Sequence, residues 1–527
     1  MISKVNKYQN FLLVLAISLF LCLIGSGAYP IYILDEAKNA EAAREMLFYS
    51  EFIVPKFNEI LRTDKPPLHY YFMIIGYKFF GVNAFGARFF SGIFGALTIS
   101  VSFYYCNKFS QKIIAWIFVF VCWSSIFFIQ EFHLAVPDPY LIFFISVGLW
   151  LFYDFYITHS NVSLLIMYLL FSLGTLTKGP IAIALPGLIC LLFLIGTKNF
   201  TLKMVLKFKP FLGFIILLIV AAPWYILVHF ETDGAWTKGF FLDHNLNRFG
   251  SKMEGHGGVF LITWAFVLLG LMPFSFFIIR AFRNSYKKGI KDSLLLFSTI
   301  VSGVFIVFFS ISGTKLPNYT MPCYPFLALV LAMAFWEFYK TNDKSIHTTI
   351  VIVLITLIAI ALPIVGKFAL LQEKELTEAS NIAYWLLPTS IASLIGLFLY
   401  VKGYFKKAFI AIALGWVIIT PILFLVIYPR LTSQNPVEQA KLILKQHDTI
   451  KVYKRFDAAF PINFQRTFSI INTQAEIDGY FKQHPQGFLM TNAREIDVLE
   501  NRRDIIKVLE VKALFESHTT RIYKKKE

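Results

Sequence analysis

Carboxylates and lysines gather in one polar stretch near the N-terminus, within a chain that is otherwise largely apolar. Asp35 and Lys38 lie in DEAKNAEAAREM, and Asp64 and Lys65 lie in TDKPPLHYYF. Acidic and basic side chains concentrated in this way indicate a reaction, or an anionic ligand held at one place. The stretch, residues 29–88, is far longer than the usual connection of about 4–6 residues, so we expect it to have structure of its own.

Two elements must position these side chains. Residues 35–47 are rich in Ala, Glu, Arg, Met and Leu without Gly or Pro, which predicts a helix. Its apolar residues recur at helical spacing, so it could lie along a membrane surface, or be a solvated helix whose charges face water. Pro66 and Pro67 fix the backbone after Lys65. Lys65 is then held where the phosphate of a membrane lipid lies, unless it merely extends its ammonium group to water.

The composition defines the class of protein. The hydrophobic fraction is 57%, the charged fraction is 15% and the net charge is +17, whereas soluble domains are about 45–50% apolar. The basic residues lie in short loops between apolar runs, as the positive-inside rule requires, so we do not expect nucleic-acid binding. The cysteines lie in or beside apolar runs and do not suggest disulfides.

We predict an all-α membrane bundle of about 13 transmembrane helices, because each span needs about 20 apolar residues. The expected spans are 11–28, 85–105, 113–129, 140–156, 162–176, 181–195, 211–229, 259–279, 294–311, 323–338, 348–365, 384–400 and 408–427. A cleaved signal peptide is the alternative for the first, since Gly25 to Ala28 resemble a cleavage site. An odd number of spans that starts inside places the C-terminus outside.

Further polar residues fall in the loops that we expect on the same outer face. Asp138 lies between two prolines, where it could cap the fourth span or add a second acidic group to the site. The loop at 230–258 contains Arg248 and His256, in a spacing that matches no metal motif. Lys315 and Tyr319 follow the ninth span.

The chain divides into two expected domains. Residues 1–429 form the membrane domain, and residues 430–527 a small α/β domain on the outer, periplasmic face. The polar second part has short runs typical of strands at 449–453, 468–471, 488–491 and 505–511. No Walker or Rossmann glycine pattern is present, so the sequence does not indicate ATP-driven transport.

Six blocks resemble the membrane glycosyltransferases that use polyprenyl-phosphate sugars. These blocks are DEAKNAEAAREM, TDKPPLHYYF, AVPDP, TKGPIAIALP, DHNLNRF and GTKLPNYTMPCYPFLALV, in that order. The resemblance covers about residues 30–335. It is strongest to the bacterial lipid A aminoarabinose transferases and extends to the protein O-mannosyltransferases. It implies a GT-C fold, in which a helical bundle and an amphipathic outer loop surround a periplasmic cavity that a lipid-linked donor enters.

The resemblance also implies roles for individual residues. The position of Lys65 contacts the donor phosphate, and Lys38 is a second cation for it, although that family more often has Arg there and Tyr at the next position, Asn39. Asp35 corresponds to the acid near the reacting sugar, where it would deprotonate an acceptor hydroxyl. If the acceptor is a phosphate, Asp35 would instead orient the sugar. Asp138 and Tyr319 align with cavity-lining positions of that family, and we assign Asp138 to catalysis and Tyr319 to the donor phosphate. Independently of the resemblance, Arg248 and Lys315 are further candidate cations for the leaving phosphate, and Asp64 and His256 are candidate ligands of a divalent metal ion.

The expected function is therefore an inverting glycosyltransferase of the bacterial inner membrane. It would move a sugar from undecaprenyl phosphate to lipid A or a related acceptor, with its active site on the periplasmic side. A protein O-glycosyltransferase is the alternative within the same class. A lipid or polysaccharide transporter is a further alternative, but it would carry ionisable groups midway through its spans, whereas here they gather in the outer loops.

Overall fold

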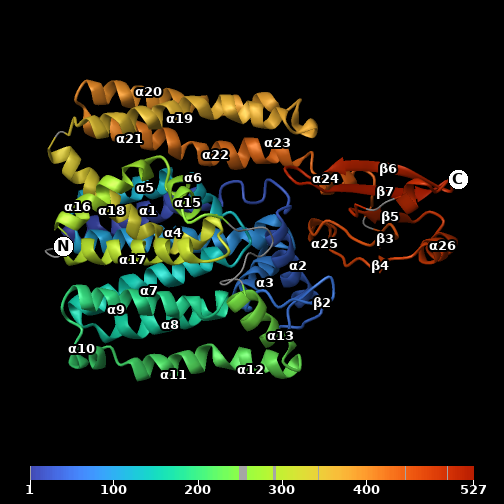
Figure 1. The fold of residues 1–527 in the computed structure, drawn as a ribbon, viewed down its shortest axis with the longest axis horizontal. Coiled ribbons are helices and arrows are strands. Elements are labelled where there is room, and N and C mark those ends of the chain that lie inside the picture. The colour runs from blue at the N-terminus through green and yellow to red at the C-terminus, as the bar shows by residue number, and fades with distance from the viewer. Residues whose placement is uncertain are drawn as a thin grey trace.

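The computed structural model describes residues 2–247, 258–288, 292–341, 343–445, 447–494 and 497–526. Long helices lie side by side in a bundle, and a sheet built from the C-terminal part of the chain lies beyond one end of it (Figure 1). We call this end of the bundle the sheet end. The polar helix α2 (Leu34–Phe48) and α3 (Leu68–Phe80) lie at the sheet end as well.

The first half of the bundle consists of α1 (Ile2–Leu23), α4 (Ala84–Phe109), α5 (Lys112–Ser124), α6 (Ile126–Glu131), α7 (Asp138–Thr158), α8 (Asn161–Lys178), α9 (Ile181–Gly196), α10 (Leu202–Lys207), α11 (Pro210–Val220), α12 (Ala222–Glu231), α13 (Ala235–Lys238) and the π-helix η1 (Gly239–Asn247). The second half consists of α15 (Ile262–Gly270), η2 (Phe274–Phe277), α16 (Ile278–Lys288), α17 (Ser293–Ile311), η3 (Pro317–Cys323), α18 (Tyr324–Lys340), α19 (Ile346–Leu371), η4 (Lys374–Leu376), η5 (Ser380–Leu386), α20 (Leu387–Val401), α21 (Phe405–Val417), α22 (Ile419–Ile422), η6 (Leu423–Ile427) and α23 (Tyr428–Thr432).

Within the described residues, nine helical segments are long and apolar enough to cross a membrane, and three shorter apolar helices accompany them. The expected bundle of membrane helices is therefore present, while the count of thirteen spans stays a prediction. The eighth expected span, 259–279, is not one continuous helix. It is divided into α15, η2 and the start of α16 around Pro273, because proline cannot continue the hydrogen bonds of a helix.

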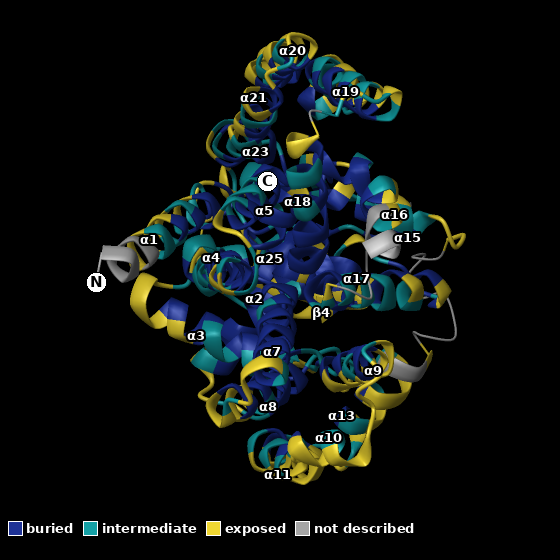
Figure 2. Cartoon of the chain, turned by 90° about the vertical axis from the view of Figure 1, so that its left-hand side faces the viewer, coloured by how far each residue is buried: buried dark blue, intermediate teal, exposed yellow. Residues whose placement is uncertain are grey.

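The outermost helices expose apolar side chains, as expected for helices that face lipid. Exposed positions concentrate on α11, α19 and α20, whereas the centre of the bundle is buried (Figure 2). In the apolar stretch 202–231, only 22% of the most apolar window is buried inside the protein. Such apolar surface needs a non-aqueous surrounding.

The helix predicted at 35–47 is present as α2, but it is not solvated. Ala37, Ala40 and Ala43 are fully buried, and so are the carboxylates of Glu36 and Glu41. These small side chains let α2 pack closely against α3 on one side and the C-terminal sheet region on the other. The interpretation of a helix whose charges face water is therefore wrong, because its polar side chains find partners inside the protein.

Between α2 and α3 the chain forms a short antiparallel pair, β1 (Lys56–Phe57) and β2 (Ile60–Leu61). Asn58 and Glu59 make the turn between these strands with positive φ angles, a conformation that asparagine tolerates better than most residues. The backbone amides of both residues donate to the Glu45 carboxylate of α2. The first polar stretch is thus folded into one unit rather than a flexible loop.

The C-terminal segment, residues 436–526, contains a five-stranded sheet in the order β4-β3-β5-β7-β6. The strands are β3 (Ile450–Tyr453), β4 (Ile470–Ile471), β5 (Phe488–Thr491), β6 (Ile505–Lys512) and β7 (Thr519–Lys525), with helices α24 (Pro436–Lys441), α25 (Ala459–Phe464), α26 (Gln474–Gln483) and α27 (Asp497–Glu500). The pairs β3–β4 and β3–β5 are parallel, and β7 runs antiparallel to β5 and β6. The four runs expected as strands coincide with β3 to β6, whereas the sequence pattern did not indicate β7.

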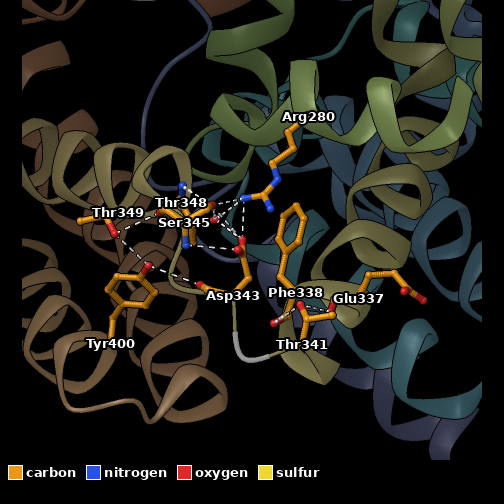
Figure 3. Close-up of polar contacts among 9 residues, drawn as sticks. All are labelled: Arg280, Glu337, Phe338, Thr341, Asp343, Ser345, Thr348, Thr349 and Tyr400. Carbon is orange, nitrogen blue, oxygen red and sulfur yellow. Dashed lines mark hydrogen bonds and ion pairs between the residues drawn. The ribbon is translucent and has the colours of Figure 1, made fainter. Parts of the chain in front are cut away.

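A polar cluster joins α16 to the start of α19. Arg280 forms an ion pair with Asp343 at 2.5 Å and donates to Ser345 and Thr348, and its guanidinium lies 4.2 Å from the centre of the Phe338 ring (Figure 3). Asp343 also accepts from Thr348, which completes the network. Tyr400 of α20 donates its hydroxyl to the Asp343 carbonyl, so this cluster connects the outer helices α19 and α20 to the core of the bundle.

Candidate active site

A cavity of about 440 Å³ lies between α7, α8, α9, α17, η1 and η3. We call it the bundle cavity. Its apolar lining includes Leu141, Ile145, Phe305, Phe308 and Phe309. Its polar lining residues are Asp64, Lys65, Asp138, Lys178, His244, Ser312, Asn318 and Tyr319. One site therefore offers an apolar surface and a group of charged side chains, as an amphipathic ligand requires.

Lys178 and Asp138 form an ion pair inside the bundle cavity, with Nζ 2.5 Å from Oδ1. Asp138 lies in the first turn of α7 and Lys178 is the last residue of α8, so each charge lies at the helix end that favours it. The Lys178 ammonium also lies 4.9 Å from the centre of the Tyr319 ring. The Lys178 ammonium of α8 is thus held in the cavity by contacts with Asp138 of α7 and Tyr319 of η3.

Lys65 and Asp64 enter the cavity from the loop before α3. Asp64 pairs with Arg62 at 2.9 Å and with the His244 imidazole at 3.1 Å. Burial acts to raise the pKa of Asp64, but the His244 hydrogen bond and the charges of Arg62 and Lys65 lower it below its usual value. Asp64 is therefore a stable carboxylate, and it orients the cations around it rather than accepting a proton at neutral pH.

The buried Arg62 is held by a network centred on Asn39 of α2. The Asn39 side-chain oxygen accepts from Arg62 Nη2 at 3.2 Å and lies 3.4 Å from His69 Nε2 and from the Tyr70 hydroxyl. Burial, together with the charges of Arg62 and Lys65, lowers the pKa of His69 well below its usual value, so this imidazole is neutral. Asn39, a departure from the resembling family, thus fixes α2 to the loop that carries Lys65.

Asp35 lies in the first turn of α2, next to this network, with an exposed side chain. It is not among the residues that line the bundle cavity. Its charge nevertheless reaches Arg62 and Glu131. Asp35 thus lies beside the charged side chains of the bundle cavity and not among them. At this position a ligand outside the cavity can contact its carboxylate.

Glu131 follows the apolar run 113–129 and is a buried acid that sequence reasoning did not assign to the site. Its Oε1 accepts from Asn318 Nδ2 at 3.4 Å. Burial and the nearby charge of Asp138 raise the pKa of the Glu131 carboxyl, with a further contribution from Asp35, while Lys178 opposes them. Glu131 therefore keeps its proton at pH values where an ordinary glutamate is ionised.

A buried ion pair fixes α2 relative to the bundle. Glu36 and Arg88 of α4 are both fully buried and form two hydrogen bonds, of 2.6 and 2.9 Å. Arg88 also donates to the carbonyls of Ser26 and Tyr29, and Glu36 accepts from the Ala135 amide. These contacts connect three segments of the chain beside Asp35, so the position of this acid is determined by long-range contacts.

The structure brings some of the expected site residues together. Asp64, Lys65, Asp138 and Tyr319 all line the bundle cavity. Lys38 instead lines a second cavity, between α2 and the C-terminal sheet. Lys315 is buried and donates to the Ser312 carbonyl at the end of α17, so its ammonium caps that helix.

Two expected residues, Arg248 and His256, lie outside the described residues. The sequence did not single out Lys178, His244 or Glu131 for the site. The TKGP block that contains Lys178 contributes to the resemblance and predicts a tight turn. Lys178 ends an apolar run on the same expected face of the membrane as Lys65. This position is the sequence feature that could have indicated a second cation in the site.

The possible metal site receives no support from the described residues. No group of three or more His, Cys, Asp or Glu side chains arranged to hold a metal occurs among them. Both carboxylate oxygens of Asp64 are already engaged, one by Arg62 and one by His244. We therefore derive no catalytic step through a metal.

Residues 64–227 match the family described as dolichyl-phosphate-mannose-protein mannosyltransferase. This segment contains Lys65, Asp138 and Lys178. An uncharacterized protein of Aquifex aeolicus is 26% identical over 365 residues, which cover 68% of this chain and 71% of that protein.

Several relatives carry the name undecaprenyl phosphate-alpha-4-amino-4-deoxy-L-arabinose arabinosyl transferase. The one from Aeromonas hydrophila is 29% identical over 331 residues, covering 60% of this chain and 58% of the relative. The one from Pseudomonas fluorescens is 27% identical and is matched over 59% of its length. The sequence match thus spans somewhat less than two thirds of these arabinosyl transferases.

Among solved structures, the crystal structure of ArnT from Cupriavidus metallidurans bound to undecaprenyl phosphate has the same fold. It aligns with a TM-score of 0.79 over 97% of both chains, at 17% sequence identity. The helical bundle of this chain is therefore a GT-C fold.

Fold and sequence together define the class: this chain resembles the membrane glycosyltransferases that use polyprenyl-phosphate sugars, which confirms the resemblance expected from the sequence. Within that class, the named relatives are the aminoarabinose transferases. The matched family and these relatives are named as transferases, and the arabinosyl transferases are named for an undecaprenyl-phosphate-linked sugar.

Proposed function

We propose that this chain is an inverting glycosyltransferase that moves a sugar from undecaprenyl phosphate to lipid A or a related acceptor at the outer face of the inner membrane. The observation that carries the proposal is the bundle cavity, in which an apolar surface of phenylalanines adjoins Lys65 and Lys178. A polyprenyl phosphate has the same two parts, an apolar chain and an anionic head group. The aminoarabinose named in the relatives is the first sugar to test.

In the proposed reaction, an acceptor oxygen attacks C1 of the sugar from the face opposite the phosphate. The new bond forms at C1 while the bond between C1 and the phosphate oxygen breaks, and its electron pair leaves with the lipid phosphate. The phosphate gains negative charge in this step, so cations already in position lower the barrier. We assign this role to Lys65 and to Lys178, which the Tyr319 ring and Asp138 hold in place.

Asp35 has one of two roles in this proposal, depending on the acceptor. A hydroxyl acceptor loses its proton as it attacks, and Asp35 would take that proton as a general base. A phosphate acceptor is already ionised, and Asp35 would then orient the sugar, or pair with its amine in the case of an aminoarabinose. The exposed side chain of Asp35 is open to either partner.

The test is transfer by the purified protein in detergent, with undecaprenyl-phosphate aminoarabinose as donor and lipid A as acceptor, followed by mass spectrometry of the lipid. We expect Asp35→Asn and Lys65→Ala to lower the rate by about 10²–10³-fold or more while the protein remains folded. Lys56→Ala is the matched control, because Lys56 lies in the same loop but lines neither cavity. Full activity in both site variants would contradict the assignment.

A protein acceptor is the second candidate, because the matched family is named for protein mannosyltransferases. The same assay with periplasmic proteins in place of lipid A distinguishes the two. We expect the sugar on lipid A and not on protein.

A further inference from the structure

A second cavity, of about 460 Å³, lies between α2 and the C-terminal sheet. We call it the sheet-edge cavity. Lys454 and Arg455 directly follow β3 and contribute to its lining, and Asn492 and Arg494 directly follow β5. The cavity therefore lies at the carboxyl ends of two neighbouring parallel strands. Figure 1 shows α2 on the bundle side of this edge of the sheet.

The place of this cavity in the sheet is itself informative. Strand β3 pairs in parallel with β4 on one side and with β5 on the other, so the chain changes direction across the sheet after β4. In open α/β sheets, ligands bind in the crevice outside the carboxyl ends of the strands at such a switch point. The topology of the C-terminal segment thus forms a binding crevice here, and α2 closes it.

The charges of the sheet-edge cavity favour an anion. Four cationic side chains line it: Lys38, Lys454, Arg455 and Arg494. The two carboxylates in the lining are both engaged by one imidazole, since His518 lies 3.2 Å from Asp457 and 3.0 Å from Glu516. Arginine side chains bind phosphate oxygens through two parallel hydrogen bonds, which suits a phosphate better than a diffuse negative charge.

The remaining lining residues suit a sugar. Tyr32 and Phe57 come from the first polar stretch, and Phe456 comes from the loop after β3. The rings of Phe57 and Phe456 stack across the boundary, with centres 6.3 Å apart. Aromatic faces can cover the apolar faces of a pyranose ring, while Asn492 and Ser517 supply hydrogen-bonding groups for its hydroxyls.

Helix α2 lines the sheet-edge cavity and is joined through Arg62 to the charged residues of the bundle cavity. Leu34 and Lys38, one turn apart, line the sheet-edge cavity. Asn39 binds the Arg62 that pairs with Asp64 of the bundle cavity, and the charge of Asp35, one turn before Asn39, also reaches Arg62. A ligand in the sheet-edge cavity therefore contacts the same helix that holds Arg62 beside Asp64.

We propose that the sheet-edge cavity binds a phosphorylated saccharide, and that this ligand is the head group of the acceptor. The acceptor role rests on the proposed function, whereas the binding of the phosphosugar does not. The C-terminal segment is then a part of the substrate-binding surface and not only a cover for the bundle.

Binding is tested first, with the full chain in nanodiscs and without donor. Glucosamine 1-phosphate in solution and lipid A in the nanodisc are the two phosphosugar probes, and unphosphorylated glucosamine is the control ligand. We expect the double variant Arg455→Gln, Arg494→Gln to weaken the binding of both probes by about tenfold or more. Lys482→Gln, an exposed lysine of α26 outside the cavity, is the control variant and should leave binding unchanged.

Comparison of the two probes, glucosamine 1-phosphate and lipid A, shows whether the site binds a free or a lipid-linked phosphosugar. Weakened binding of lipid A alone supports a lipid-linked head group, and weakened binding of both probes supports a site that also accepts free sugar phosphates. Unchanged binding of both probes in the double variant, or equal binding of glucosamine and glucosamine 1-phosphate, would overturn the proposal. If the double variant does not fold, the single variant Arg455→Gln decides, because Arg455 is exposed at the surface.

The acceptor role is tested by kinetics. We expect the double variant to raise the KM for lipid A by about tenfold or more, with the KM for the donor unchanged. An unchanged KM for lipid A would overturn the acceptor role even if the phosphosugar binds. A further outcome is that the wild-type protein transfers no sugar and still binds both probes more tightly than the double variant does. In that case the proposed transferase function is wrong, whereas the assignment of a phosphosugar site to the sheet-edge cavity is supported.

Discussion

At the scale of single residues, Lys178 has two possible roles that mutation can separate: it neutralises Asp138, and in the proposed reaction it stabilises the leaving phosphate. It pairs with the buried Asp138 and lies over the Tyr319 ring, so its removal leaves a carboxylate without its cation. We expect Lys178→Met to lower both the melting temperature and the transfer rate, the latter by about 10²–10³-fold if it stabilises the leaving phosphate.

The double variant Lys178→Met, Asp138→Asn separates the two effects. Removal of both charges should restore the melting temperature, because no uncompensated buried charge remains. Transfer should stay slow, since the cation for the phosphate is still absent. Recovery of activity together with stability would mean that Lys178 serves only to neutralise Asp138.

Glu131 gives a prediction about pH. Burial and the charges of Asp138 and Asp35 raise its pKa, against the opposing charge of Lys178. The carboxyl is therefore neutral near pH 7 and ionises as the pH rises through its raised pKa. This ionisation adds a negative charge beside Asp138 and opposes the binding of an anionic donor, so the transfer rate at low donor concentration should fall on the alkaline side.

The variant Glu131→Gln keeps a neutral side chain at every pH and can still accept from Asn318. We expect it to remain active near pH 7 and to lose the alkaline decline in kcat/KM. The measurement is a pH profile of transfer for both proteins. An unchanged decline in the variant would show that another group is responsible.

At the scale of elements, the Glu36–Arg88 pair anchors α2, and the role that we propose for Asp35 depends on where this helix is held. Both charges are fully buried, and breaking such a pair by removing one partner typically costs about 3–5 kcal/mol. We expect Arg88→Met to destabilise the protein by this amount and to increase amide hydrogen exchange in residues 34–48. The exchange of α7 should change much less, because it does not contact this pair directly.

The variant Glu36→Gln is the milder comparison. It removes the charge of the carboxylate but keeps an oxygen that can accept from the Ala135 amide, as Glu36 does at 2.9 Å. We expect a smaller loss of stability than in Arg88→Met, with transfer reduced because Asp35 shifts. Normal exchange in α2 in both variants would contradict the anchoring role.

Local patterns and long-range contacts differ in how far the sequence could predict them. The spans, the helix at 35–47 and the placement of Lys65 after a polar turn follow from composition, helix propensity and proline geometry, all of which act over a few residues. The partner of Glu36 is 52 residues away, and that of Asp138 is 40 residues away. No spacing rule identifies such partners, because they depend on how the helices pack.

The position of Lys38 illustrates the same limit. The sequence places it one turn after Asp35 on the predicted helix, but it does not say which structure covers that face of the helix. The C-terminal segment covers it, so Lys38 lines the sheet-edge cavity instead of the bundle cavity. The composition of residues 430–527 predicted a separate α/β domain on the outer face, but not that it would cover this face of α2.

At the scale of the whole molecule, we propose that the C-terminal segment and the first polar stretch form one folding unit rather than two domains joined by a linker. Apolar residues of α2, α3, β3 and α25 share one core. Asn58 connects the two parts directly: its side chain donates to the Phe468 carbonyl at 3.0 Å and accepts from the Phe468 amide at 2.7 Å.

We therefore expect Asn58→Ala to loosen the C-terminal segment from the bundle. The substitution leaves the buried backbone groups of Phe468 without partners, which typically costs about 1–3 kcal/mol. It should increase hydrogen exchange both in residues 450–471 and in α2, because the two share a core. Thr467→Ala is the control, since its hydroxyl donates to Glu59 at an exposed position. If exchange rises only in the C-terminal segment and α2 stays protected, the two parts are independent units, and the C-terminal sheet does not determine the position of Asp35.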